Sequence, residues 1–211
     1  MGCRCQGRFK GGLYRWGDQL STLARDFTPH ADPVVLELGS WKGKSSVMLA
    51  AGLIGKQNTE LFCVDPFGSD ENAEHQSKYY AALLEEDRRS SAEMFRHNMS
   101  TCGVDSIAQQ VKSYSFDIVR TWTTPIDMLF IDANHECPAV LRNFETWLEF
   151  LKQGGVIAFR DANGKWPGPT RVEKEKLQLP KFGPVNAVDT LAWAVMASKR
   201  EKDKTSEEVG V

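Results

Sequence analysis

Four short, largely apolar stretches, each closed by a glycine or an acidic residue, constrain the fold of this chain most. They are, in chain order, PVVLELG (33–39), LFCVD (61–65), IDMLFID (126–132) and VIAFRD (156–161). Apolar runs of this length are typical of strands buried on both faces of a parallel sheet. Helical patterns alternate with them, and this alternation predicts an α/β fold, a doubly wound and mostly parallel sheet with helices on both faces.

The segments between these runs carry the helical patterns. The clearest helix follows the third run, and its inward face is formed by Val140, Phe144, Trp147, Leu148 and Leu151, with Gly154 and Gly155 expected to end it. Further helices are expected at 12–27 with Phe27 inward, at 44–54 with Ile54 inward, after a capping box at 90–93, in the polar stretch around Tyr80, Leu83 and Leu84, and at about 170–178. Additional strands are expected at 108–112, 182–188 and 190–197.

Composition places these elements in one domain. The chain has 211 residues, and we expect a single domain over 12–198 between a flexible leader (1–11) and a disordered, charged tail (199–211). The formal net charge of −2 disfavours a nucleic-acid partner, which needs a surplus of Lys and Arg. No apolar run approaches the roughly 20 residues that span a bilayer, and no signal-peptide core is visible, so the expected location is cytoplasmic, without a membrane partner. Assembly into a homo-oligomer is left open.

The turn after the first apolar run is rich in glycine. Its sequence is ELGSWKGKS (37–45), in which Gly39 and Gly43 let the backbone turn tightly and approach a ligand closely. An ordinary strand-to-helix turn is the plainest interpretation. A phosphate-binding GxxxxGK[ST] loop is disfavoured, because the spacing from Gly39 to Gly43 is one residue too short for that cradle.

Acidic residues end the predicted strands. Glu37, Asp65, Asp132 and Asp161 all lie at or near a carboxyl end, the edge where such sheets bind ligands. Asp65 follows Gly39 by 26 residues, and an acid in this place can bind the hydroxyls of a ribose. A capped turn before Pro66 is the alternative role for Asp65.

Three motifs in order resemble one known family. VLELGSWKGKSS, FCVDPFG and FIDANHECPAVLRNFETWLEFLKQGGVIAFRDA are similar to the motifs of class I S-adenosylmethionine-dependent methyltransferases that act on small molecules. The resemblance runs from about Pro33 to Ala162. It implies a Rossmann-like, seven-stranded sheet with an antiparallel last strand, and methyl transfer from S-adenosylmethionine to a small-molecule acceptor, most simply a hydroxyl group.

The resemblance also implies a cofactor site. Its expected residues surround the methionine, ribose and adenine portions, and they are Glu37, Gly39, Ser40, Trp41, Gly43, Ser45, Asp65, Phe67, Ser113, Ser115 and Asp132. Among these, Asp65 is expected to bind the ribose, Phe67 to pack near the adenine, and Ser113 and Ser115 to lie at the adenine rim. Trp41, Trp122 and Trp166 are candidates for an acceptor pocket.

A hydroxyl acceptor must lose its proton, which calls for a general base or a metal ion. The expected catalytic residues are His135, Asp132 and Asp161. His135 is the candidate base, because the ordinary pKa of histidine is about 6.5, and its alternative role is to cap the following helix. Asp132 and Asp161 are the candidate ligands of a Mg²⁺ ion. Asn134 and Arg160 replace an acidic residue and a histidine that are usual in the family, which weakens the metal expectation.

Two other functions stay open at this point. A nicotinamide-dependent oxidoreductase uses a similar glycine turn and spaced acid, although the chain lacks GxGxxG. A cofactor-binding domain that has lost its catalytic activity is the other alternative, because of Asn134 and Arg160.

Overall fold

The computed structural model describes residues 15–68 and 90–198. The predicted leader (1–11), the predicted tail (199–211) and the polar stretch with Tyr80, Leu83 and Leu84 lie outside these residues. The single-domain boundaries 12–198 therefore stay a prediction. Among the described residues, no helix has the length and apolar character needed to cross a membrane.

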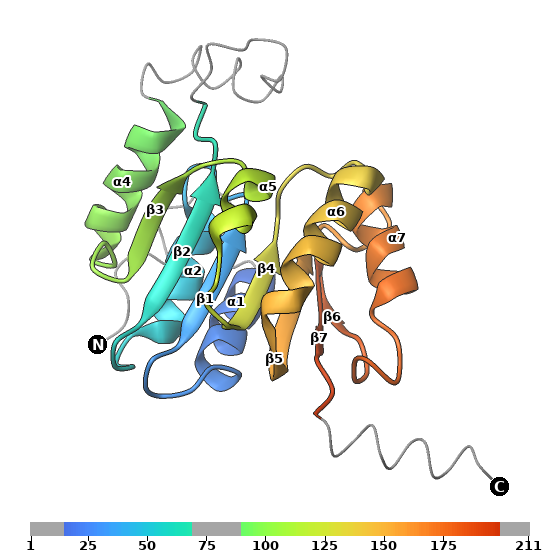
Figure 1. Cartoon of the computed structure of the whole chain (residues 1–211). Helices are drawn as coiled ribbons and strands as arrows, with labels where there is room; N and C mark the ends of the chain where they lie inside the picture. Colours follow the sequence, from blue (N-terminus) through green and yellow to red (C-terminus); the bar gives the residue numbers. More distant parts are fainter. Residues whose placement is uncertain (1–14, 69–89, 199–211) are drawn as a thin grey trace, which may run out of the picture.

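Seven strands form one sheet in the order β3-β2-β1-β4-β5-β7-β6. Their bounds are β1 Val34–Leu38, β2 Glu60–Asp65, β3 Ala108–Lys112, β4 Ile126–Ile131, β5 Leu151–Arg160, β6 Asn186–Val188 and β7 Leu191–Val195. β1 to β5 pair in parallel, and β7 pairs antiparallel with both β5 and β6 (Figure 1). The predicted doubly wound sheet with an antiparallel last strand is confirmed.

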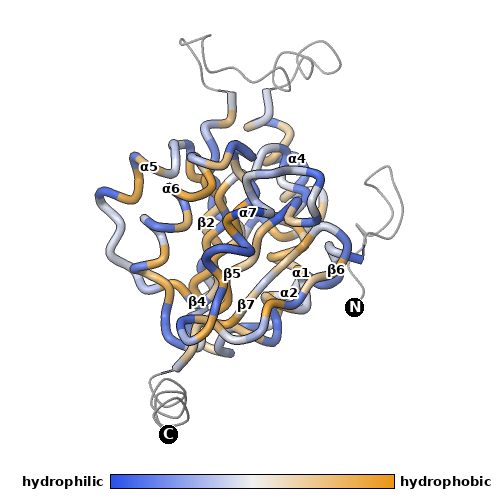
Figure 2. The backbone as a smooth tube through the Cα atoms, turned by 90° about the vertical axis from the view of Figure 1, so that its right-hand side faces the viewer, coloured by the Kyte–Doolittle hydropathy of each residue, from blue (hydrophilic) through white to orange (hydrophobic). Residues whose placement is uncertain are grey.

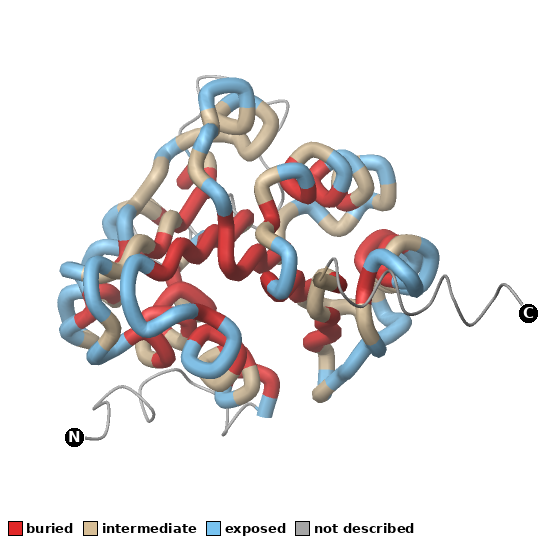
Figure 3. Tube along the Cα trace, turned by 60° about the horizontal axis from the view of Figure 1, so that its bottom comes forward, coloured by how far each residue is buried: buried red, intermediate tan, exposed pale blue. Residues whose placement is uncertain are grey.

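Successive strand residues point to opposite faces of the sheet, and each face has its own core. In β1, Val35 belongs to one buried cluster, whereas Leu36 belongs to the other. All five residues of β1 and all six of β4 are buried, which explains why these segments read as apolar runs without alternation. Figure 2 shows the strands largely in orange, and Figure 3 shows buried segments running through the centre of the molecule.

The first core lies beneath α1 (Arg15–Asp26), α2 (Lys44–Leu53) and α4 (Ser91–Cys102). α1 and α2 approach closely at Gly52, where an added Cβ would lie 2.1 Å from the carbonyl oxygen of Ser21. The predicted capping box at the start of α4 is confirmed, because Ser90 and Glu93 bond to each other's backbone N–H groups. Two inward positions were wrong, since Phe27 is 39% exposed and Ile54 is 58% exposed.

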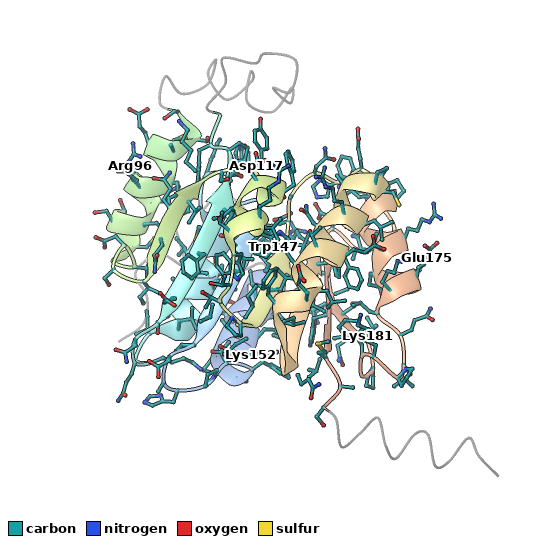
Figure 4. The ribbon with its side chains drawn as sticks, viewed as in Figure 1. Arg96, Asp117, Trp147, Lys152, Glu175 and Lys181 are labelled. Atoms are coloured by element: carbon teal, nitrogen blue, oxygen red, sulfur yellow. The ribbon has the colours of Figure 1, made fainter. Side chains whose placement is uncertain are left out.

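The second core lies beneath α6 (Cys137–Trp147) and α7 (Pro167–Lys176), with the short helix α5 (Ser115–Ile118) beside them. Two 3₁₀ turns, η2 (Val119–Thr121) and η3 (Leu148–Phe150), complete this side. In Figure 4, Trp147 lies between α6 and the sheet, where it is fully buried, whereas Glu175 points outward from α7.

The predicted end of the helix at Gly154 and Gly155 was wrong. The α-helix ends at Trp147, and Leu151 begins β5, so both glycines lie inside a strand. The register between β4 and β5 shifts at this point, and Gly154 has φ +80°. An added Cβ on Gly155 would lie 2.9 Å from the carbonyl oxygen of Asp127. The glycines therefore permit an irregular start of β5, a role that the helical spacing of the apolar residues concealed.

Candidate active site

The site lies where the strand order reverses, between β1 and β4. Asp65 ends β2, Asp132 directly follows β4, and Asp161 directly follows β5. Glu37 lies one residue before the end of β1. The strands are parallel, so these four acidic residues belong to one edge of the sheet, as the sequence predicted, and this is the edge at which doubly wound sheets bind ligands.

The glycine turn holds its shape through close backbone approaches. Gly39 has φ +91°, and an added Cβ would lie 2.3 Å from the carbonyl oxygen of Asp132. The N–H of Gly39 donates to the carbonyl oxygen of Val64 at 2.9 Å. Gly43 precedes α2 with φ +83°, and its Cβ would lie 2.5 Å from Cε of Met99. Only glycine fits both positions, so the turn joins β1, β2 and β4 at one point.

Glu37 is a buried carboxylic acid beneath this turn. One carboxylate oxygen, Oε2, accepts a hydrogen bond from the hydroxyl of Ser46. The other oxygen, Oε1, and the hydroxyl of Ser40 have no hydrogen-bond partner among the described residues, although both are buried. Burial raises the pKa of Glu37 to about 7, while the neighbouring serine hydroxyls act in the opposite direction. Ser45 is also buried here.

Asp65 is held by backbone N–H groups. Its Oδ2 accepts from the N–H of Trp41 at 2.9 Å, and its Oδ1 accepts from the N–H of Phe67 at 2.6 Å. The capped-turn role is thus present, and it ties the end of β2 to the glycine turn.

The three predicted adenine residues have structural partners. The ring of Phe67 is 1% exposed and packs edge-on against Phe95, with centroids 5.2 Å apart. The structure therefore places it in the core beneath the turn and not on an open surface. Ser115 donates to Oδ1 of Asn143 on α6 at 2.6 Å, and Ser113 follows β3, with its N–H bonded to the carbonyl oxygen of Asp65.

The three predicted catalytic residues come together. Nε2 of His135 lies 3.3 Å from Oδ2 of Asp161 and 3.7 Å from Oδ1 of Asp132. The imidazole stacks on the indole of Trp166, with centroids 5.0 Å apart and planes 21° from parallel. About 29% of the His135 side chain is exposed, although its Nε2 atom is buried between the two carboxylates.

The two carboxylates determine the charge of His135. Asp132, followed by Asp161, raises its pKa to about 9, although partial burial acts against the charged form. The expected pKa near 6.5 is therefore corrected, and the imidazole is mostly protonated at neutral pH. Burial raises the pKa of Asp132. Burial also acts to raise the pKa of Asp161, but His135 and Arg160 outweigh it and hold that pKa below its usual value.

The loop after β4 fixes the backbone at His135. Oδ1 of Asn134 accepts from the N–H of Glu136 at 2.7 Å, so Asn134, and not His135, supports the start of α6. From the other side, α7 packs closely, since a Cβ on Gly168 would lie 2.1 Å from the carbonyl oxygen of His135. The imidazole of His135 therefore contacts the carboxylates of Asp132 and Asp161 and does not cap the helix.

Arg160 is a further charged member of the site, which the sequence showed only as a departure from a family pattern. Its Nη1 contacts Oδ1 of Asp161 and the hydroxyl of Thr190. Its guanidinium carbon lies 4.1 Å from the centroid of the Trp16 ring, on α1. Its position at the end of β5, directly before Asp161, is the sequence signal that could have revealed this role.

The aromatic candidates for an acceptor pocket separate into two groups. Trp166 lies against His135, and Trp41 is 41% exposed, with Nζ of Lys42 4.5 Å from its ring centroid. Trp122 instead packs edge-on against Phe62 and Trp147 beside the second core, so its role is packing.

The site was expected to bind Mg²⁺, and its ligand atoms are close enough for a metal. One ligand atom from each of Asp132, His135 and Asp161 lies within 4.8 Å of the others. The surrounding charges do not fit a divalent ion, however. Arg160 contacts Asp161 directly, so a divalent ion would lie beside a positive charge that already pairs with one of its ligands. The Mg²⁺ expectation is therefore not supported, and no catalytic step is assigned to a metal.

Comparison with known sequences places residues 36–162 in a family described as a methyltransferase domain. An uncharacterized protein of Acanthamoeba polyphaga mimivirus is 27% identical over 150 residues, which cover 67% of this chain and 57% of that protein. The chain thus spans less than two thirds of the length of this curated relative.

Solved structures share the fold at low identity. The O-methyltransferase TomG from Streptomyces achromogenes, in complex with SAM, is 19% identical with a TM-score of 0.61, covering 89% of this chain and 82% of that one. The O-methyltransferase from Bacillus cereus, in complex with SAH, is 17% identical with a TM-score of 0.61, covering 88% and 82%. These similarities confirm the Rossmann-like fold.

Proposed function

The chain belongs to the family of methyltransferase domains, and we propose that it transfers a methyl group from S-adenosylmethionine to a hydroxyl group of a small molecule. Bound S-adenosylmethionine supplies an electrophilic methyl group on a sulfonium sulfur. As the methyl carbon bonds to the acceptor oxygen, its bond to sulfur breaks and the sulfur leaves as a neutral thioether. The remaining requirements are alignment, exclusion of water and removal of one proton.

The strongest support for this donor is the pair of buried, unpartnered polar atoms beside the glycine turn. Oε1 of Glu37 and Oγ of Ser40 are proposed to receive the ammonium group of the methionine portion, because both atoms are buried and lack a partner among the described residues. Gly39 lets the backbone approach that group, and Asp65 at the end of β2 is proposed to bind the ribose hydroxyls. Gly43, Ser45 and Trp41 complete this half of the site, with Ser113 and Ser115 near the adenine.

His135 is proposed to accept the acceptor's proton on its imidazole, whose exposed part faces away from the two carboxylates. Its neutral form is the active one, and with a pKa of about 9 that form is a minority at neutral pH. The raised pKa makes the neutral imidazole a stronger base. Its pKa approaches that of a phenolic hydroxyl group, which is about 10. A phenolic acceptor also fits Trp166, which presents an aromatic face beside His135.

Calorimetry followed by a turnover assay tests this function. The protein is titrated with S-adenosylmethionine, NAD and ATP, and we expect binding of S-adenosylmethionine alone. Binding of NAD in its place would instead favour an oxidoreductase. The second step measures transfer of a labelled methyl group to phenols, sugars and glycosylated natural products. Tight donor binding without transfer to any of them would favour a domain that has lost its activity.

A further inference from the structure

The guanidinium group of Arg160 contacts residues from three separate parts of the chain. Its guanidinium is held from three directions, by Asp161, by the hydroxyl of Thr190 in the turn before β7, and by the ring of Trp16 on α1. Its side chain is 19% exposed. Arginine keeps its charge at every accessible pH, so a permanent positive charge is built into this edge of the sheet.

This charge lies beside Asp161, one of the residues that would ligate a metal ion. Oδ1 of Asp161 contacts Arg160, and Oδ2 of the same carboxylate faces His135 at 3.3 Å. Both oxygens are thus engaged by nitrogen groups of the chain itself. A divalent ion bound through Oδ2 would lie beside the guanidinium on the same carboxylate, against electrostatic repulsion.

We propose that Arg160 is the built-in cation of this site, which fixes Asp161 toward His135 and makes the site independent of divalent metal ions. The inference rests on the proposed methyl transfer for its catalytic meaning. That an arginine keeps metal ions from this pair of carboxylates is inferred from the contacts of Asp161 with Arg160 and His135 alone. Arg160 is a positioning residue, since it acts on the reaction through Asp161 and His135.

Metal binding gives a readout that does not depend on activity. Wild-type protein is titrated with Mn²⁺ and Mg²⁺ by calorimetry, and we expect no saturable binding at submillimolar concentration. Arg160→Gln frees one oxygen of Asp161, and we expect Mn²⁺ affinity to rise at least about tenfold. Arg160→Lys keeps the charge and should stay as insensitive to metal as wild type.

Matched variants separate this effect from a general change of charge. Arg171→Gln removes an exposed arginine paired with Glu175 on α7, and it should leave Mn²⁺ binding unchanged. Arg160→Gln/Asp161→Asn should lose the affinity that Arg160→Gln gains. Stoichiometric Mn²⁺ binding by wild type that Asp161→Asn abolishes would overturn the proposal. If Arg160→Gln does not fold, the wild-type titration and Arg160→Lys decide the question.

Activity distinguishes this inference from the proposed function. Methyl transfer that is unaffected by a chelator supports both, and transfer that a chelator abolishes and Mg²⁺ restores overturns the built-in cation while the proposed function stands. Failure to bind S-adenosylmethionine overturns the proposed function, whereas the Mn²⁺ titrations still decide whether Arg160 closes the site to metals.

Discussion

Asp65 and Asp161 follow the same rule of position, at the carboxyl ends of parallel strands, but the chain holds them in different ways. Asp65 is 5% exposed, and its oxygens accept from the backbone N–H groups of Trp41 and Phe67. Asp161 is held by the side chains of Arg160 and His135. One half of the site is therefore organised by backbone geometry and the other by charged side chains.

The two halves of the site should respond differently to pH and ionic strength. Backbone donors carry no titratable charge, so above the pKa of about 7 of the buried Glu37 the half around Gly39 and Asp65 should keep its geometry. Ion pairs of partly exposed side chains depend on pH and ionic strength. A donor site held by backbone and an acceptor site held by charges can thus be perturbed separately, and the variants below test that separation.

The largest expected effect is on turnover in the charged half. Substituting His135→Gln should lower the rate of methyl transfer by about 10² to 10⁴, because no base is left at that position. The affinity for S-adenosylmethionine should stay within a few-fold, as measured by calorimetry. In wild type, the rate should rise with pH toward about 9 and then level off. A profile that levels off near pH 6.5 would remove His135 from the role of base.

The next effect tests the backbone half. Gly39→Ala places a methyl group 2.3 Å from the carbonyl oxygen of Asp132 at a φ of +91°. We expect a loss of roughly 3 to 5 kcal/mol in the free energy of unfolding, measured with denaturant, from strain and overpacking together. Gly55→Ala is the matched control, because Gly55 has φ +86° with no atom within 4 Å of its added Cβ. It should lose only about 1 to 2 kcal/mol.

The same division explains what the sequence could predict. Glycine turns and strand-end acids are local patterns, so the positions of Gly39, Gly43, Asp65 and Asp161 followed from spacing alone. The capping box at Ser90 was predicted from a local pattern in the same way. The seven-stranded sheet, in contrast, was implied by the family resemblance. The glycine turn, the acids at the strand ends and the capping box depend on residues that are neighbours in the chain.

The charged half depends on tertiary contacts. Trp16 and Thr190 lie far from Arg160 in the sequence, and only the packing of α1 and β7 brings them to it. The pKa of His135 depends first on Asp132, its near neighbour in the chain, and then on Asp161, which follows the next strand. The irregular start of β5 was missed because helical spacing continues through Leu151, whereas the register of β4 against β5 is set by pairing.

A smaller effect concerns donor affinity. Asp65→Asn should weaken S-adenosylmethionine binding by about 1.5 to 3 kcal/mol, the cost of losing a charge-assisted hydrogen bond. Asn keeps an acceptor for one of the two N–H groups of Trp41 and Phe67, whereas Ala keeps none, so the free energy of unfolding is measured beside the affinity. Asp117→Asn, at an exposed carboxylate on α5, is the control. An unchanged dissociation constant in folded Asp65→Asn would contradict the ribose role.

The smallest effect is a pH dependence of stability in the charged half. The pKa of His135 is about 9 in the folded chain and near its ordinary 6.5 when unfolded. Its ion pairs therefore stabilise the fold fully below pH 6.5, and this contribution is lost as the pH rises through 9. Between pH 7 and 9 we expect a loss of about 2 kcal/mol in the free energy of unfolding.

His135→Gln isolates that contribution. The buried thiol of Cys63 has a raised pKa and also reduces stability as the pH rises toward 9 and above, because only the unfolded chain ionises there. Glu37, with a pKa raised to about 7, affects stability chiefly between pH 4.5 and 7. Both groups are present in wild type and variant, so the difference between their unfolding curves at pH 7, 8 and 9 reports His135 alone. Curves that stay parallel across this range would mean that the carboxylates of Asp132 and Asp161 do not hold a proton on His135, and the charged half would then owe its geometry to Arg160.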